Sequence, residues 1–134
     1  MELKDDMHCF VCGRDNPMGL RLRFDIDEAA RSIKTVFQPG KEHQGYKDVV
    51  HGGLISTVLD EAMTKLAFSL GLDAVTGRLT VRFKRPLMVG EWVTVTGRLV
   101  KESGRAIEAE AVAVRDDGTV IAEAEGLLMK LRTK

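Results

Sequence analysis

Long apolar runs are missing from this chain of 134 residues, and so is an excess of either charge. None of its apolar stretches reaches the ~18 residues that a helix needs to cross a bilayer. Lys and Arg together number 20, as do Asp and Glu, so the formal net charge is zero. A neutral chain has no overall attraction to nucleic acid or to an anionic membrane. We therefore expect neither as a partner.

Cysteine is scarce as well, since the chain holds only Cys9 and Cys12, within Cys-Phe-Val-Cys. Two cysteines this close together cannot make the disulfide framework of a secreted protein. A signal peptide would need an apolar stretch where the chain reads MELKDDMHCF. Together these absences predict a cytoplasmic protein.

The histidine beside the two cysteines raises the question of a metal site. His8, Cys9 and Cys12 offer three ligands, whereas a structural zinc site takes four, usually as two pairs. Without a second pair, His43, His51 or a second copy of the chain would have to complete the set. We therefore expect no metal and no cofactor, and we interpret the two thiols as anchors of a small apolar loop.

The first half of the chain predicts an irregular segment, two strands and a helix. Its length suits one domain with one core over residues 1–134, and residues 1–19 contain the Gly and Pro of a loop. Alternating apolar and polar residues predict strands over 20–27 and 32–37. After a loop, the apolar period becomes helical from Leu54 to about Leu70, and Gly71 ends it.

A period of two residues then returns and predicts four strands, over 79–84, 92–100, 106–115 and 119–131. Short turns at 103–104 and 116–118 make consecutive hairpins, so the sheet is expected to be antiparallel. Small residues recur in the last strands, as suits a sheet that lies close to its helix; they are Ala109, Ala111, Ala113, Ala122 and Ala124. The predicted fold class is α+β, with one long central helix wrapped by a curved antiparallel sheet of about five to six strands.

The segment that opens the helix, His51-Gly52-Gly53, carries the most chemistry. The first N–H groups of a helix have no partner within it and lie at the positive end of its dipole. Such N–H groups can bind an oxygen that becomes negative in a transition state. Asp60, about two turns further on, is a candidate nucleophile or general base. The same pattern also allows a capping histidine, a tight glycine turn and a solvated aspartate.

The string HGGLISTVLDEA resembles the hot-dog-fold thioesterases of the phenylacetate-pathway (PaaI-like) type. In that family a His-Gly-Gly motif precedes a helix, and an acidic residue follows nine positions after the His, as Asp60 follows His51. The resemblance extends to HCFVCGRDNPMGLRLRF before the helix and to TGRLTVRFKRPLMVGE after it. It implies a hot-dog acyl-coenzyme A thioesterase that assembles as a homodimer or homotetramer, with active sites between protomers.

The resemblance also implies roles for single residues. The N–H of Gly52 would polarise the thioester carbonyl, and Asp60 would act as general base on water or as nucleophile. Thr76 falls where relatives carry a Ser or Thr that positions the water or the carboxylate. His51 would hold the loop or contact the thioester, and Gly53 would help to bind the substrate.

Two positions depart from the family pattern. The usual Asn six residues before the His is Gly45 here, and the usual Gly three residues before it is Asp48. These departures bear on how water is positioned. We expect Gln44 or His43 to take the place of the missing Asn at the substrate.

A basic cluster and two rival functions complete the expectations. Arg82, Lys84 and Arg85 are predicted to contact the phosphates of coenzyme A, the alternative being a solvated outer face of a strand. A hot-dog dehydratase or hydratase acting on acyl thioesters would use the same fold. A non-catalytic acyl-coenzyme A-binding module would keep the pocket without the reaction.

Overall fold

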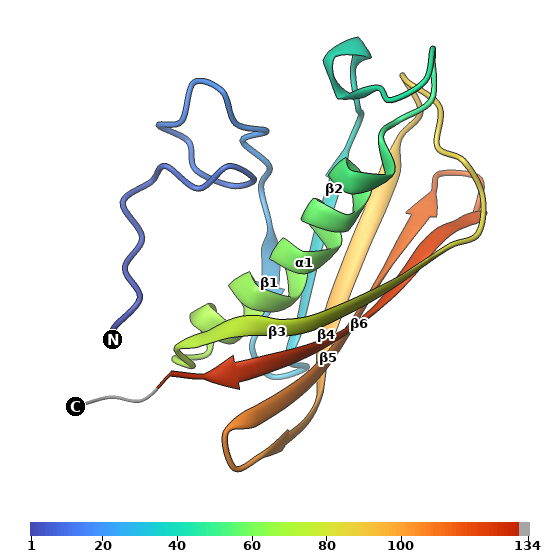
Figure 1. Cartoon of the computed structure of the whole chain (residues 1–134). Helices are drawn as coiled ribbons and strands as arrows, with labels where there is room; N and C mark the ends of the chain where they lie inside the picture. Colours follow the sequence, from blue (N-terminus) through green and yellow to red (C-terminus); the bar gives the residue numbers. More distant parts are fainter. Residues whose placement is uncertain (132–134) are drawn as a thin grey trace.

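The computed structural model, which describes residues 1–131, places one long helix across a six-stranded antiparallel sheet (Figure 1). Across the sheet the strands follow the order β1-β2-β4-β5-β6-β3. Their bounds, with those of the helix, are β1 Asp25–Asp27, β2 Ser32–Phe37, α1 Gly52–Ser69, β3 Ala74–Phe83, β4 Val93–Ser103, β5 Ala106–Arg115 and β6 Val120–Lys130. A short 3-10 turn, Lys41–His43, precedes α1. This is the predicted α+β class and the hot-dog order of elements.

Helix α1 forms because its apolar residues return every three or four positions and meet the sheet on one side. Its buried side chains are Ile55, Val58, Leu59, Ala62, Met63, Leu66 and Ala67. The helix ends where predicted, since Gly71 adopts a φ of 81°, a left-handed conformation that a glycine tolerates without strain. Within residues 1–131, no helix is both long enough and apolar enough to span a membrane.

The sheet lies close to the helix because its facing positions are small, as the sequence predicted. The five predicted alanines of β5 and β6 are all buried. Gly97 of β4 lies close to the helix: a Cβ added there would lie 3.1 Å from Ile33 Cγ2 of β2 and 3.4 Å from Ala62 Cβ of α1. The second of these neighbours sits on the rigid body of α1. A larger side chain at position 97 therefore has no room.

Replacing Gly97 with valine is expected to lower the free energy of unfolding by about 1–3 kcal/mol, the usual cost of overpacking a core. The measurement is urea unfolding followed by circular dichroism. Thr96→Val serves as the control, since Thr96 neighbours Gly97 but points away from the helix, and it should change stability by no more than about 0.5 kcal/mol. Equal stabilities for the two variants would contradict the tight approach.

The predicted strand over 20–27 is wrong in its first half, because only Asp25–Asp27 pair with the sheet. Leu20 and Leu22 instead donate their N–H groups to the carbonyls of Phe10 and Val11, at 2.8 Å each. Arg21 between them has a φ of 53°, which interrupts an extended strand. The apolar side chains of this segment still pack against the core. The alternation of apolar and polar residues therefore predicted correctly which side chains pack against the core. It did not predict the backbone pairing, because these N–H groups bind the N-terminal segment instead of a strand.

The strand after the helix begins five residues earlier than predicted, at Ala74 instead of Leu79. Its pairing with β6 shifts register between Thr76 and Arg78, and this bulge hides the alternation that would have revealed the strand. Strand β3 lies at the edge of the sheet and pairs, among the described residues, only with β6. Its outer edge therefore presents unpaired backbone groups.

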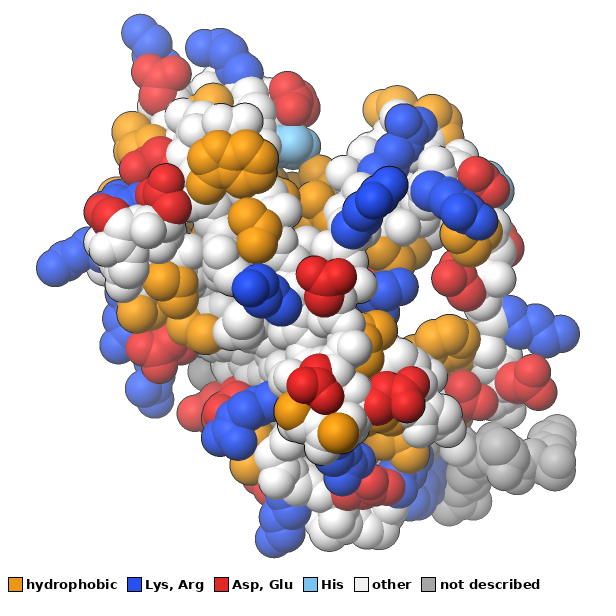
Figure 2. Space-filling view, turned by 180° about the vertical axis from the view of Figure 1, so that it is seen from behind, with side chains coloured by type: hydrophobic (Ala, Val, Ile, Leu, Met, Phe, Trp, Pro, Cys, Tyr) orange, Lys and Arg blue, Asp and Glu red, His pale blue; other side chains and the backbone are white. Residues whose placement is uncertain are grey.

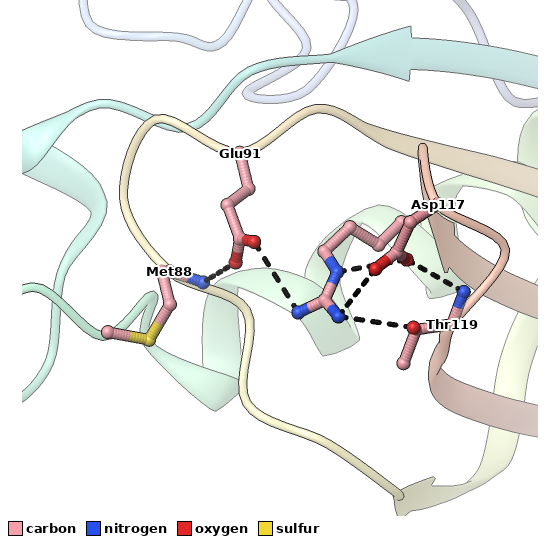
Figure 3. Close-up of polar contacts among 5 residues, drawn as sticks. Met88, Glu91, Asp117 and Thr119 are labelled. Carbon is pink, nitrogen blue, oxygen red and sulfur yellow. Dashed lines mark hydrogen bonds and ion pairs between the residues drawn. The ribbon is translucent and has the colours of Figure 1, made fainter.

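The β5–β6 hairpin closes at the predicted Asp116-Asp117-Gly118 turn and is tied down by Arg115 (Figure 3). The guanidinium of Arg115 donates to Asp117 at 3.1 and 2.8 Å and lies 3.4 Å from the Glu91 carboxylate. The Arg115 hydrogen bonds, and after them those of Thr119, hold the pKa of Asp117 well below its usual range. The network links this turn to the loop before β4, at the end of the sheet shown in the close-up.

The sheet surface away from the helix is polar and carries both signs of charge. Arg98 forms an ion pair with Glu110 there, and Lys84 lies 3.8 Å from Glu123. Figure 2, seen from behind, shows Lys and Arg side chains interspersed with Asp and Glu across that side of the molecule. Charges of both signs are therefore mixed on this face.

Candidate active site

The start of α1 is capped by its own histidine. His51 has an extended backbone, with φ −61° and ψ 128°, and its Nδ1 accepts the N–H of Gly53 at 2.9 Å. The N–H groups of Leu54 and Ile55 both reach the His51 carbonyl, at 3.0 and 3.3 Å. The capping alternative is therefore what the structure shows for His51. Because the Gly53 N–H donates to the imidazole of His51, Gly53 has no free N–H for the substrate.

These contacts single out the N–H of Gly52. Of the N–H groups that open α1, it alone has no hydrogen-bond partner within residues 1–131, since Gly53, Leu54 and Ile55 are all bonded to His51. It lies at the positive end of an 18-residue helix. The Phe83 ring packs beside it, since a Cβ added at Gly52 would lie 3.4 Å from Phe83 Cζ. A donor with an apolar wall beside it suits a developing oxyanion.

Asp60 is half-buried on α1 and is held by one residue of the sheet. Its Oδ1 accepts the hydroxyl of Thr76 at 2.6 Å, across 16 residues of sequence. The bond orients one carboxylate oxygen and leaves the second for another partner. The solvated alternative for Asp60 does not apply here, because a fixed hydroxyl and partial burial replace free solvent around it. The structure thus brings together two of the predicted site residues.

The predicted site residues fall into two groups that one chain cannot unite. Gly52 and Asp60 lie eight residues apart on the same helix, or roughly 12 Å at 1.5 Å rise per residue. The carbonyl oxygen would have to sit about 3 Å from the Gly52 N–H while the carbonyl carbon is within reach of Asp60 or of a water that Asp60 binds. Both residues nevertheless lie along β3, since Thr76 near one end of that strand binds Asp60 and Phe83 at the other end packs on Gly52.

The loop before the helix forms a hollow beside His51 and Gly52, lined further by Gln44, Gly45, Tyr46, Val49 and Val50. Asp48, where the family resemblance led us to expect Gly, has a φ of 64°, the left-handed conformation that glycine adopts most readily. Its N–H binds Gln44 Oε1 at 3.0 Å, so that oxygen holds the loop. His43 is likewise engaged, because its Nδ1 accepts the N–H of Gly40 at 2.9 Å. The substrate roles predicted for Gln44 and His43 stay predictions.

The three basic residues near the end of β3 divide between two surroundings. Arg82 pairs in register with Glu123 on the outer face of the sheet, and Lys84 lies 3.8 Å from the same carboxylate. Lys84 and Arg85 are exposed and directly follow Phe83, the residue that packs on Gly52. The outer-face alternative therefore describes Arg82 and Lys84, which share Glu123, whereas Arg85 has no such carboxylate partner among the residues that the structure describes.

The two cysteines of the N-terminal segment contact α1, beside a carboxylate that the sequence did not single out. Cys9 Sγ lies 3.2 Å from Glu61 Oε2, and Lys65 Nζ lies 3.3 Å from Cys12 Sγ. Burial and the nearby Glu61 raise the pKa of the Cys12 thiol to about 12. His8 is not part of this group; its Nδ1 lies 2.8 Å from the carbonyl of Asp6. Glu61 is 52 residues from Cys9, so no local spacing could reveal it.

Comparison with known proteins identifies the family. The sequence model of the thioesterase superfamily matches residues 47–122, more than half of the chain and the whole of α1. The chain belongs to the thioesterase superfamily. This match covers every predicted catalytic residue, from His51 to Thr76.

Relatives within the thioesterase superfamily agree with this assignment. Acyl-coenzyme A thioesterase THEM4 of Rattus norvegicus is 29% identical over 123 residues, 91% of this chain and 53% of that protein. Human acyl-coenzyme A thioesterase THEM5 is 32% identical over 98 residues, 72% of this chain and 40% of that protein. The chain thus spans about half the length of the curated relatives it matches.

Solved structures confirm the hot-dog fold. The PaaI protein of E. coli, from the phenylacetic acid degradation operon, superposes with a TM-score of 0.74 at 20% identity, covering 83% of this chain and 81% of that one. A hypothetical thioesterase from Streptococcus pneumoniae, solved with coenzyme A, gives a TM-score of 0.75 at 17% identity, with 84% and 88% covered.

Proposed function

We propose that this chain hydrolyses acyl-coenzyme A thioesters in a site shared between two protomers. The observation that carries the proposal is the half-buried Asp60 carboxylate, oriented by Thr76 within a chain of the thioesterase superfamily. Relatives matched over as much as 91% of the chain are named acyl-coenzyme A thioesterases. The activity is a proposal for this protein because those relatives are about twice as long.

Thioester hydrolysis needs an N–H donor that binds the carbonyl oxygen, and a base or nucleophile. The Gly52 N–H, with the helix dipole behind it, donates to no acceptor within residues 1–131 and so would be free to donate to the thioester oxygen. Asp60 would take a proton from water as the water attacks the carbonyl carbon, after which the tetrahedral intermediate expels the coenzyme A thiolate. Direct attack by Asp60, through an anhydride, is the other route open to the same carboxylate.

The edge strand β3 supports a shared site. It exposes a ten-residue edge, with the large apolar side chains Val75 and Phe83 at 42% and 53% exposure. An unpaired edge of this length invites another strand. We expect the β3 strand of a second copy to pair with it, which makes one continuous sheet across a homodimer. Two such dimers can form the homotetramer.

The register of such a pairing follows from where the site residues meet β3. The bulge in β3 has to be counted: Thr76 and Phe83 pair with Leu128 and Ala122 of β6, each three residues from Glu125, which pairs with Thr80. Antiparallel pairing of two copies about Thr80 sets Thr76 opposite the partner's Phe83. Because Asp60 binds Thr76 and Gly52 contacts Phe83, Asp60 then lies close to the partner's Gly52. The separation within one chain is thus removed by the second chain.

Coenzyme A phosphates would be bound near the same end of β3. Lys84 and Arg85 are exposed and follow Phe83, whose ring packs beside the Gly52 position that would receive the thioester. Cationic side chains bind phosphate through charge-assisted hydrogen bonds. Arg85 is the strongest candidate, because Glu123 lies opposite Arg82 on β6 and 3.8 Å from Lys84 Nζ.

A panel of acyl-coenzyme A esters, short, long and aromatic, tests the function when thiol release is followed with a chromogenic disulfide. Release from at least one ester, at a rate proportional to purified protein, is the expected result. A change in enoyl-thioester absorbance without thiol release would instead show a dehydratase or hydratase. Binding of an acyl ester without either reaction would show a non-catalytic module.

A further inference from the structure

We propose that Cys9, Cys12 and Glu61 form a binding site for one thiophilic divalent cation, with zinc as the natural ion. Their ligand atoms all lie within 4.8 Å of one another, and all three residues are half-buried. Tetrahedral zinc binds thiolate sulfur and carboxylate oxygen at about 2.0–2.3 Å, which brings neighbouring ligands to separations of this order. Residues 1–131 contain no other such group of three.

The backbone around the cysteines is arranged as a turn that presents both sulfurs on one side. The N–H of Val11 donates to Cys9 Sγ at 3.4 Å, and the N–H of Gly13 donates to the Cys9 carbonyl at 2.9 Å. A Cβ at Gly13 would lie 2.3 Å from Cys9 N, so the turn requires glycine there. The N–H bond and the turn fix the Cys9 sulfur within 4.8 Å of the Cys12 sulfur and the Glu61 oxygen. The turn therefore holds both sulfurs toward α1 instead of merely filling a loop.

The charges around the group also balance with a divalent ion in place. Two thiolates and the Glu61 carboxylate carry three negative charges. A divalent cation and the Lys65 ammonium, 3.3 Å from Cys12 Sγ, carry three positive charges. Lys65 follows Glu61 by one helical turn and so lies on the same face of α1. Hydrogen bonds from such an outer residue orient and tune a metal ligand.

A site with three protein ligands keeps its fourth position for water, and here that position opens to the surface. The group lines a shallow surface hollow, which Asp5, Thr64 and Phe68 also border. The ion would join the N-terminal segment to α1 at the residue next to Asp60. Its proposed role is to fasten this segment over the helix, away from the Gly52 N–H that receives the substrate.

The test is a cobalt titration of reduced, metal-free protein, followed by zinc displacement and elemental analysis. We expect thiolate-to-cobalt charge-transfer absorption together with visible bands of tetrahedral cobalt, at one ion per chain. Zinc should abolish both signals and raise the melting temperature, as any ligand of the folded state does. Cys12→Ser should lose the charge-transfer band, and Glu61→Gln should weaken binding by at least the roughly tenfold that loss of even an outer partner costs.

His8→Ala is the matched control, since His8 adjoins Cys9 in sequence but lies outside the group. It should bind cobalt as the unchanged protein does. The proposal is overturned if the reduced protein shows no thiolate-to-cobalt band, if the band survives in Cys12→Ser, or if His8→Ala loses it. Formation of a Cys9–Cys12 disulfide with no cobalt bound by the reduced form would likewise replace the proposal with a redox pair. If Cys12→Ser fails to fold, Glu61→Gln decides.

Discussion

Replacing Asp60 with asparagine is expected to lower kcat on the best acyl-coenzyme A ester by about 100-fold or more, the lower end for loss of a general base. Asparagine keeps the shape and can still accept the Thr76 hydroxyl, which Asp60 receives at 2.6 Å. It can neither take a proton from water nor attack a carbonyl. The fold should therefore persist while the reaction stops. Steady-state thiol release, with circular dichroism to confirm folding, is the measurement.

Two further variants sharpen this prediction. Asp116→Asn removes an exposed turn carboxylate and should leave kcat unchanged. Thr76→Val should fall between the two, because Asp60 keeps its charge but loses the hydroxyl that orients it. Full activity in Asp60→Asn would remove Asp60 from the reaction. A single turnover in ¹⁸O-labelled water separates the two routes, since attack of water on an anhydride at Asp60 itself would leave label in the protein.

Mixing Gly52→Pro with Asp60→Asn should restore activity that neither variant has alone. Proline removes the one N–H at the helix start that has no partner within residues 1–131. The substitution fits the backbone, because proline is favoured at the first helical position and His51 before it is extended. In a mixed dimer one site loses both groups and the other keeps both. Random subunit exchange makes about half of the dimers mixed, so roughly one quarter of the wild-type rate should return.

The control for this experiment is Gly52→Ala, which keeps the N–H. A Cβ there would meet Phe83 at 3.4 Å, an ordinary contact, so this variant should be folded and should retain most of the activity. Sedimentation of each variant confirms that dimers form. A fully active monomer, or a mixture that remains as inactive as its parts, would exclude the shared site.

The sequence predicts a segment of this fold well when its structure depends on residues near it in the chain, and poorly when its hydrogen-bond partners are distant. The periodicity of α1 and the alternation of β2 and β5 come from which face each element buries, and their boundaries agree with the predicted ones to within two residues. Hairpin turns such as Asp116-Asp117-Gly118 are equally local. The segment over 20–24 fails this condition, because its N–H groups bind Phe10 and Val11 and not a neighbouring strand.

The site divides in the same way. The His51-Gly52-Gly53 motif and the position of Asp60 follow from spacing along one helix and from the family resemblance, so both were predicted. The bond from Thr76 to Asp60 requires the fold to bring β3 beside α1, and the resemblance alone pointed to it. The Gly53 N–H is not available to a substrate, because it donates to His51 Nδ1. That bond depends on the orientation of the imidazole ring, which the sequence does not reveal.

By itself, the sequence determined the fold class, the helix and its motif, because each rests on periods and spacings within one segment. Only the tertiary structure decided which N–H at the helix start remains free, which strand is the open edge, and that Glu61 meets the cysteines 52 residues away. A contact between distant segments depends on how two elements pack and on where a turn reverses the chain. Neither the packing nor the chain reversal produces a repeating pattern in the sequence from which the contact could be predicted.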